Sequence, residues 1–341
     1  MNMKKTAVQI LFCLIVIMMT MGYLLRGGGF ARFIQDLMML RPADVILAFT
    51  LLMGYILLES VIIKVIMHSL DEEVSMLQCC KYSFIGFFFY CITPAGSGEQ
   101  PSQLYAMHKD GLSTAKSLFA LTLITITFKL AIVVLGVCVY VFKPEEVMRM
   151  IAPISPLCIL GLVLSAGCVV LFICLLWIPS NIEKLAKLVI MQLGKIGVLH
   201  DTDKYVHMLS DFMKKYEETV DECLAQKPLP VVVLLITVAQ RVCLLAITAV
   251  MAWATGHARL GWASVVSVQG MVQLGTEMLP LPGGAGANEL MFLRAFRPAY
   301  GHNTLSVLML SRGVSFYGQL AICGIMSLII AVAAKMKRGN K

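Results

Sequence analysis

Apolar stretches long enough to cross a membrane recur along the chain, separated by short polar segments. The hydrocarbon core of a bilayer is crossed by a helix of about 20 mostly apolar residues. The pattern therefore predicts an all-α integral membrane protein with about six transmembrane helices. The predicted spans are residues 6–25, 43–67, 117–142, 154–177, 229–255 and 304–334.

Two further apolar stretches are shorter and end in loops rich in glycine and proline. Residues 75–92 lead into the loop TPAGSGEQP, and residues 261–278 lead into LPLPGGAGANE. Such a break exposes backbone N–H and C=O groups, which are tolerated at membrane depth only where protein or a water-filled cavity covers them. We therefore expect two re-entrant helical hairpins, at about residues 75–110 and 261–297.

The two loops also resemble each other. Residues 94–99 read P-x-G-x-G-E, and residues 282–289 read P-x-G-x-G-x-x-E. With the N-terminus in the cytoplasm, the order of the spans makes the first hairpin enter from the cytoplasm and the second from outside. Interrupted hydrophobic segments at corresponding positions of two halves point to an inverted-repeat transporter and its binding site. The two halves of this predicted repeat are residues 1–178 and 229–341. The alternative to a repeat is that the two Pro/Gly loops match by chance.

A polar segment, residues 179–228, separates the two halves. Its apolar side chains fall at helical spacing within residues 182–196 and 209–223, and the other faces mix Lys with Asp and Glu. This is typical of a cytoplasmic pair of amphipathic helices. We expect the pair to pack on the bundle or to lie in the membrane interface. The alternative is a docking site for a partner.

Composition and charge narrow the class of protein. The 341 residues are 59% hydrophobic and 14% charged, whereas soluble domains are nearer half apolar and a quarter charged. This excludes a typical soluble enzyme and a disordered chain. The net charge is +8 and both chain ends are basic, as expected when both termini lie in the cytoplasm. No basic run with interleaved aromatic residues occurs, so no nucleic-acid partner is expected.

The patterns of metal centres and of common enzymes are missing from the sequence. Most of the 11 cysteines lie inside apolar runs, where a thiol acts as a small hydrophobe. The 6 histidines are scattered. No zincin, P-loop or nucleophile-elbow motif occurs. We expect no metal, no cofactor and no catalytic residue in this chain.

Ionisable residues inside the predicted spans and hairpins are the strongest functional candidates. Each costs at least a few kcal/mol at the membrane centre, so it marks a functional site or the partner of one. Three such cations have no carboxylate at helical spacing, namely Lys129, Arg241 and Arg312. Their expected partners come from the hairpins, namely Glu99, Glu277 and Glu289. The alternative is a set of buried ion pairs that only fix the hairpins in register. Glu59 is expected to pair across the bundle, and Lys64 to reach the cytoplasmic interface.

Polar groups near the two breaks are expected to form a path for a lipid head group. Glutamines four residues apart share one face of the second hairpin, and a half-helix N-terminus with bare backbone N–H groups suits an anion. The candidate lipid-binding residues are Pro94, Gly96, Gly98, Glu99, Gln100, Gln103, Lys129, Gln240, Arg241, Gln273, Glu277, Pro282, Gly283, Gly284, Gly286, Asn288, Glu289, Arg294 and Arg312.

The two loop motifs resemble the signatures of a known family. The first loop, P-x-G-x-G-E followed by Gly111, and the second, L-P-x-P-G-G-x-G-x-x-E, are similar to those of the lysylphosphatidylglycerol synthase/flippase membrane-region family. This is the transmembrane part of the bacterial multiple peptide resistance factor. The resemblance implies a flippase region without the soluble aminoacyl transferase domain of larger members. Many members carry arginine where this chain has Gly96 and Ser102, which implies other phosphate donors or a different head group here.

The resemblance also implies a function. It implies flippase-like movement of phosphatidylglycerol-type or aminoacylated phosphatidylglycerol lipid across the bacterial inner (cytoplasmic) membrane, which supports resistance to cationic antimicrobial peptides. One alternative is a lipid-modifying enzyme, or the membrane subunit of a phosphatidylglycerol lysyltransferase. Another is a secondary transporter of a small polar or anionic solute. Membrane phospholipid is the expected partner. Two further partners stay open, a second copy of the chain in a homodimer and a separately encoded soluble synthase.

Overall fold

The computed structural model describes residues 29–177, 187, 188, 191, 202–225, 228–256 and 260–339. Throughout these ranges the regular structure is helical, without strands. The longer helices are α3 (Pro42–Ser69), α6 (Thr114–Phe142), α8 (Ser155–Trp177), α10 (Thr202–Ala225), α11 (Leu229–Ala254) and α15 (Gln319–Gly339). The shorter ones are α2 (Gly29–Met39), α4 (Met76–Ile92), α5 (Glu99–Lys109), α7 (Glu145–Ile151), α12 (Trp262–Thr276), α13 (Ala287–Tyr300) and α14 (Thr304–Arg312).

Five helical stretches of the described residues are long and apolar enough to cross a membrane. They are Pro42–Ser69, Thr114–Phe142, Glu145–Cys174, Leu229–Ala254 and Ala287–Met336. They contain or closely match the five predicted spans from residue 43 onward, whereas the predicted span at residues 6–25 lies outside the described residues. The expected fold class, an all-α membrane protein, is confirmed.

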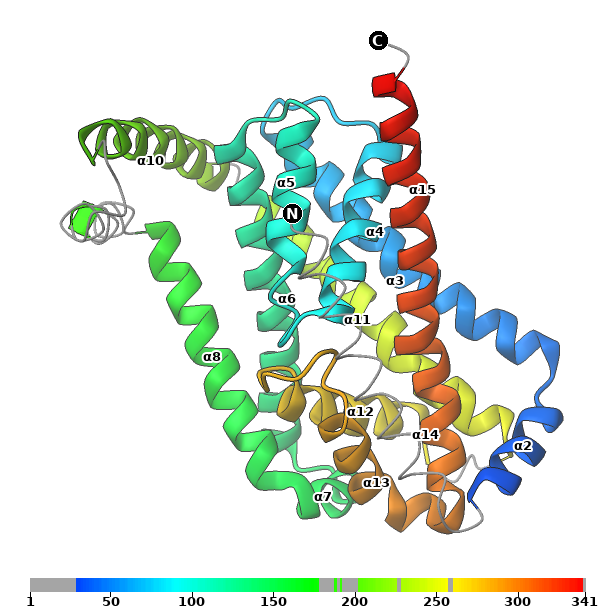
Figure 1. Cartoon of the computed structure of the whole chain (residues 1–341). Helices are drawn as coiled ribbons and strands as arrows, with labels where there is room; N and C mark the ends of the chain where they lie inside the picture. The colour runs from blue at the N-terminus through cyan, green and yellow to red at the C-terminus, as the bar shows by residue number, and fades with distance from the viewer. Residues whose placement is uncertain are drawn as a thin grey trace.

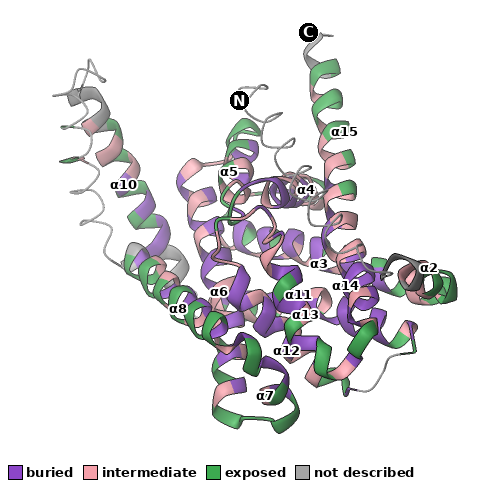
Figure 2. Ribbon diagram, turned by 60° about the horizontal axis from the view of Figure 1, so that its bottom comes forward, coloured by how far each residue is buried: buried purple, intermediate pink, exposed green. Residues whose placement is uncertain are grey.

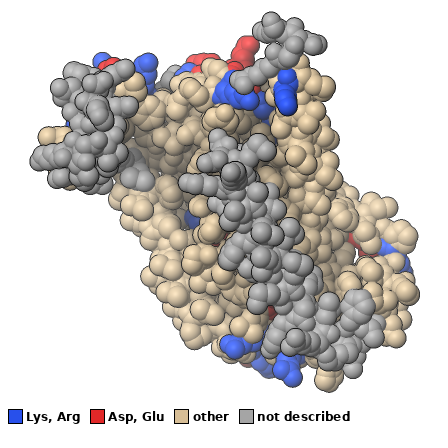
Figure 3. All heavy atoms as spheres, viewed as in Figure 1, with Lys and Arg blue, Asp and Glu red and all other residues tan. Residues whose placement is uncertain are grey.

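The outer surface of the bundle suits lipid. On α8, Ile159, Val163 and Val170 are exposed, and on α15, Leu328 and Ile329 are exposed, so that both helices present green outer faces in Figure 2. Figure 3 shows most Lys, Arg, Asp and Glu near the top and bottom of this face, with a broad belt between them that carries few charges. Because apolar side chains on a large exposed surface need an apolar solvent, this belt is the lipid-facing part of the protein.

Two helical hairpins lie inside this bundle. Figure 1 shows α4 and α5 starting from the end of the bundle that carries the C-terminus, and α12 and α13 lying toward the opposite end. A capping box begins α4, in which the Ser75 side chain accepts from the Gln78 N–H and the Gln78 side chain accepts from the Ser75 N–H. Both hairpins turn at the predicted Gly/Pro loops. Entry of each hairpin into a bilayer from one side stays a prediction.

Three apolar cores hold the hairpins in place. One packs α4, α5 and α6 around Tyr82, Met107 and Phe119 near the C-terminal end of the bundle. A second packs α12 and α13 around Met271 and Phe292 at the other end. A third joins α3, α4, α11 and α14 between them. Each hairpin is therefore anchored along its helices, while its turn reaches the middle of the bundle.

The second helix of the polar segment also belongs to the first of these cores. Met213, Tyr216 and Val220 of α10 are buried with residues of α6, and Figure 1 shows the rest of α10 extending sideways from the bundle. The other predicted helix of the pair, residues 182–196, falls largely outside the described residues.

The last span is interrupted rather than continuous. A π-helical turn, Gly313–Gly318, joins α14 to α15, although the sequence predicts one unbroken helix over residues 304–334. Single π-helical turns inside α-helices are frequent at functional sites. This turn lies beside the second hairpin, since Phe316 contacts the position where a side chain at Gly283 would start.

Candidate functional site

The two Gly/Pro loops share one backbone conformation. We call Thr93–Gly98 the first tip and Leu281–Gly286 the second tip. After the proline of each tip, two consecutive residues have positive φ: Ala95 (50°) and Gly96 (67°) in the first, Gly283 (56°) and Gly284 (66°) in the second. The turn of each tip is closed by matching bonds: the Gly96 N–H donates to Thr93 O (3.2 Å) and the Gly284 N–H donates to Leu281 O (3.1 Å). This duplication of geometry favours a repeat over a chance match.

The tips meet each other at the centre of the bundle. Pro94 and Pro282 form an isolated antiparallel bridge, and the Ala95 N–H donates to Leu281 O over 3.4 Å. Each tip therefore covers polar backbone of the other, which is the condition under which irregular backbone survives at membrane depth. Ala95 is a non-glycine residue in the left-handed region, a strained conformation that concentrates at functional sites.

Beside the tips, two cations share one carboxylate. Lys129 Nζ of α6 lies 2.8 Å from Glu277 Oε1, and Arg241 of α11 lies 3.6 Å from the same oxygen. The side chains of Arg241 and Glu277 are each only 4% exposed. The Arg241 guanidinium also stacks on Phe128 and donates to its carbonyl oxygen over 3.4 Å. The cluster thus holds two buried positive charges against one negative charge.

The second tip is clamped from the last span. Arg312 Nε donates to Glu289 Oε1 over 2.9 Å, and its NH2 group donates to Gly283 O over 3.1 Å. Glu289 in turn accepts from the Gly286 N–H over 2.6 Å, which caps the start of α13. The guanidinium lies 4.4 Å from the centroid of the Phe316 ring. One arginine therefore connects the tip, the helix that follows it and the π-helical turn.

We expect the clamp to be measurable as a coupling energy. Arg312→Gln and Glu289→Gln should each destabilise the protein, and the double variant should be less destabilised than the sum of the two. A direct contact of this kind gives interaction energies of about 0.5–3 kcal/mol. The measurement is the thermal unfolding midpoint of the four proteins in the same detergent. Additive effects would contradict the clamp.

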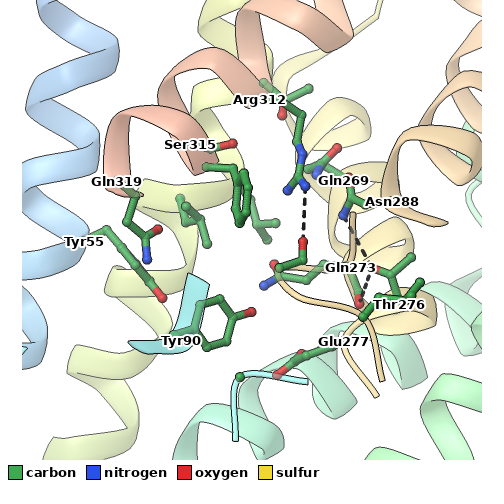
Figure 4. A pocket seen from close by; sticks show the side chains of 18 of the residues that line it. Tyr55, Tyr90, Gln269, Gln273, Thr276, Glu277, Asn288, Arg312, Ser315 and Gln319 are labelled. Atoms are coloured by element: carbon green, nitrogen blue, oxygen red, sulfur yellow. Dashed lines mark hydrogen bonds between the residues drawn. The ribbon is translucent and has the colours of Figure 1, made fainter. Parts of the chain in front are cut away.

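A cavity lies beside the second tip and is lined mainly by polar residues (Figure 4). Its empty space is about 740 Å³, including the part that opens to the surroundings. Figure 4 shows Arg312 entering from the last span, with Gln273 on α12, Glu277 directly after α12, and Tyr55 and Tyr90 on the far side. Further polar lining residues are Thr248, Gln269, Thr276, Asn288, Ser315 and Gln319. The cavity can therefore hold a polar group near the point where the tips meet.

Comparison with known families decides what kind of protein this is. A family model described as the lysylphosphatidylglycerol synthase TM region matches residues 8–323. The chain belongs to this family. A search among curated proteins gives no match. The lysylphosphatidylglycerol synthase TM region predicted from the two loops is thereby confirmed, and with it a membrane role in lipid handling.

Most of the predicted lipid-binding residues of this TM region gather around the tips. Four lie elsewhere in the bundle. Arg294 is exposed on α13, Gln100 donates to Thr125 Oγ1 over 2.8 Å, Gln103 is buried against Gly86, and Gln240 bonds to α3. No cation lies within ion-pair distance of Glu99 in the part of the chain that the structure describes. The binding roles of all these residues stay predictions.

Several cavity residues were not singled out by the sequence. Tyr55 and Tyr90 line the far wall, and Ser315 and Phe316 come from the π-helical turn. Nothing separates these two tyrosines from others in apolar helices. The glycines at both ends of the turn, Gly313 and Gly318, were the available signal for the other two.

Proposed function

We propose that this chain moves an anionic phospholipid across the cytoplasmic membrane, with the head group passing between the two tips. The observation that carries the proposal is the tip-to-tip contact beside a polar cavity. A head group needs a polar path through the bundle, whereas its acyl chains can stay in the surrounding lipid. Phosphatidylglycerol suits the family, and its aminoacylated forms keep the anionic phosphate although they add an amine. We propose that both termini lie in the cytoplasm.

Charge supports an anionic head group. The ion-paired cluster around the tips contains three cations and two carboxylates: Lys129, Arg241 and Arg312 against Glu277 and Glu289. Glu277 and Arg312 line the cavity itself. The excess positive charge lies on Lys129 and Arg241, which share Glu277. A lipid phosphate in the cavity would balance it, and charge-assisted bonds from arginine to phosphate are among the strongest polar contacts. Passage of the head group would break the bond between Ala95 and Leu281 and re-form it behind.

The proposal is tested with purified protein in liposomes. Fluorescent phosphatidylglycerol is placed in one leaflet, and its movement is followed by quenching from outside. We expect wild type to move lipid faster than empty vesicles. Arg241→Ala should slow this movement by about tenfold or more, because loss of one charged contact of about 1.4 kcal/mol in the passage state has that effect. The matched control is Arg297→Ala, an exposed arginine on α13, which should move lipid like wild type.

Other results would replace the proposal. If wild type moves lipid no faster than empty vesicles, the proposal of lipid translocation is wrong. Uptake of a small anion without lipid movement would favour a secondary transporter. Aminoacyl transfer to lipid by the purified chain would favour the lipid-modifying alternative.

A further inference from the structure

A second polar cluster adjoins the ion pairs along α11, since Gln240 belongs to this cluster and the next residue, Arg241, belongs to the ion pairs. Its centre is Glu59 of α3, which is only 2% exposed. Ten residues separate Glu59 from Ser69, the end of α3, which places this carboxyl about 15 Å along the helix at 1.5 Å per residue. That is about half of a hydrocarbon core of roughly 30 Å. Glu59 therefore carries a carboxyl group near the middle of the membrane.

The hydrogen bonds around Glu59 are incomplete. Gln240 Nε2 donates to Glu59 Oε2 over 3.0 Å and to Tyr55 O over 3.2 Å. Glu59 Oε1 and Gln240 Oε1 are both buried and accept from no donor among the described residues. Gln103 of α5 adds one amide group whose Nε2 is likewise without an acceptor. The Gln103 amide is the only neutral donor of this cluster that still has free hydrogens, and no positively charged donor completes the bonds of the Glu59 carboxyl among the described residues.

No cation forms an ion pair with Glu59 among the described residues. Within the described ranges no lysine or arginine lies at ion-pair distance from this carboxyl, and the nearest guanidinium in its surroundings, Arg241, is held by Glu277 and Phe128. The other titratable groups that face Glu59 are Glu99 of α5 and Tyr55 of its own helix. Neither supplies a positive charge. A buried carboxylate without a partner is very costly, whereas a protonated carboxyl is neutral and gains one O–H donor.

We propose that Glu59 is a proton-binding site whose loading and release are coupled to movement of the substrate through the tips. Its neighbours provide the connection. Gln240 bonds Glu59 while the next residue, Arg241, bonds Glu277 beside the tips. Gln103 reaches the cluster from the first hairpin, and Ser60 donates to Ser83 of the same hairpin over 2.9 Å. A proton on Glu59 therefore changes the bonding of α11 and of the first hairpin together.

Proton binding is tested without any lipid movement. Purified protein in nanodiscs is taken through a pH titration while infrared difference spectra record the C=O band of protonated carboxyl groups. We expect one component of this band in wild type to be lost in Glu59→Gln, which keeps the shape and removes the titration. The matched control is Glu72→Gln, on a half-exposed salt bridge with Lys116, which should leave that component in place. An unchanged band in Glu59→Gln would overturn the proton site.

Coupling is tested in the liposomes of the lipid assay and rests on the proposed function. We expect a proton gradient to accelerate lipid movement by wild type by about 5- to 150-fold, the usual range of coupling between two sites. Glu59→Gln should move lipid at a rate that does not depend on the proton gradient. Acceleration by a sodium gradient alone, or an unaltered proton response in Glu59→Gln, would overturn the coupling. If no protein moves lipid but the infrared component behaves as expected, the proposed function fails while the proton site stands.

Discussion

Glu277→Ala should unfold at a much lower temperature than wild type, with a loss of about 3–5 kcal/mol in unfolding free energy. The value is that expected when one partner of a buried charge cluster is removed. The reason is that Glu277 is the one carboxylate of the described residues within ion-pair distance of Lys129 and Arg241, and the three side chains are 4–13% exposed. Without Glu277, two cations stay in the middle of the bundle with no ion-pair partner among these residues.

The control for this experiment is a pair of the same type at the surface. Lys116 and Glu72 lie 3.6 Å apart with side chains 27% and 21% exposed, so Glu72→Ala should cost about 1 kcal/mol or less. Lys129→Met added to Glu277→Ala should recover part of the loss, because it removes one of the two uncompensated charges. Equal unfolding temperatures for Glu277→Ala and Glu72→Ala would show that the cluster does not hold the bundle together.

Gly283→Ala should destabilise the second tip for two separate reasons. Its φ of 56° belongs to the left-handed region, where a residue with a Cβ atom is strained by about 1–2 kcal/mol. The new Cβ atom would also overlap the ring of Phe316, and overpacking of this kind costs about 1–3 kcal/mol more. We expect a loss of about 2–5 kcal/mol in total, together with loss of lipid movement.

Gly284, the next residue of the same tip, separates these two contributions. It also has positive φ (66°), but a Cβ atom there would meet its neighbours only at the ordinary contact distance of 3.7 Å. Gly284→Ala should therefore show the backbone strain without the overlap. Unfolding can be followed with a thiol-reactive dye, because the thiols of Cys79, Cys158 and Cys323 are buried and not in disulfides. If Gly283→Ala and Gly284→Ala unfold at the same temperature, Phe316 does not confine the tip.

The sequence predicts the spans well because a helix in lipid needs a continuous apolar run of sufficient length. The stretch predicted at residues 43–67 is observed as Pro42–Ser69, and that at 229–255 as Leu229–Ala254. In a bilayer the apolar run itself sets the length of the helix, so its ends are visible in the chain. The tips are equally visible, because glycine and proline favour turns of this kind.

Partner choice within the site could not be predicted in the same way. The sequence offered three cations and three carboxylates, but the structure gives Glu277 two partners, and Glu99 has none among the described residues. Such pairing depends on how helices far apart in the chain are oriented. Arg294 is a different case. It follows Glu289 by five residues, about 140° around the helix at 100° per residue, so its exposure was readable from the spacing.

The π-helical turn has a consequence for how the last span can move. A wide turn of this kind is about one residue out of register with α-helical bonding. Its return to α-helical bonding would rotate α15 by about 100° about its own axis relative to α14. Arg312, before the turn, would keep its grip on Glu289, while Gln319, after it, would swing out of the cavity wall. Rotation of α15 at the π-helical turn would therefore change the wall of the cavity while the second tip stays in place.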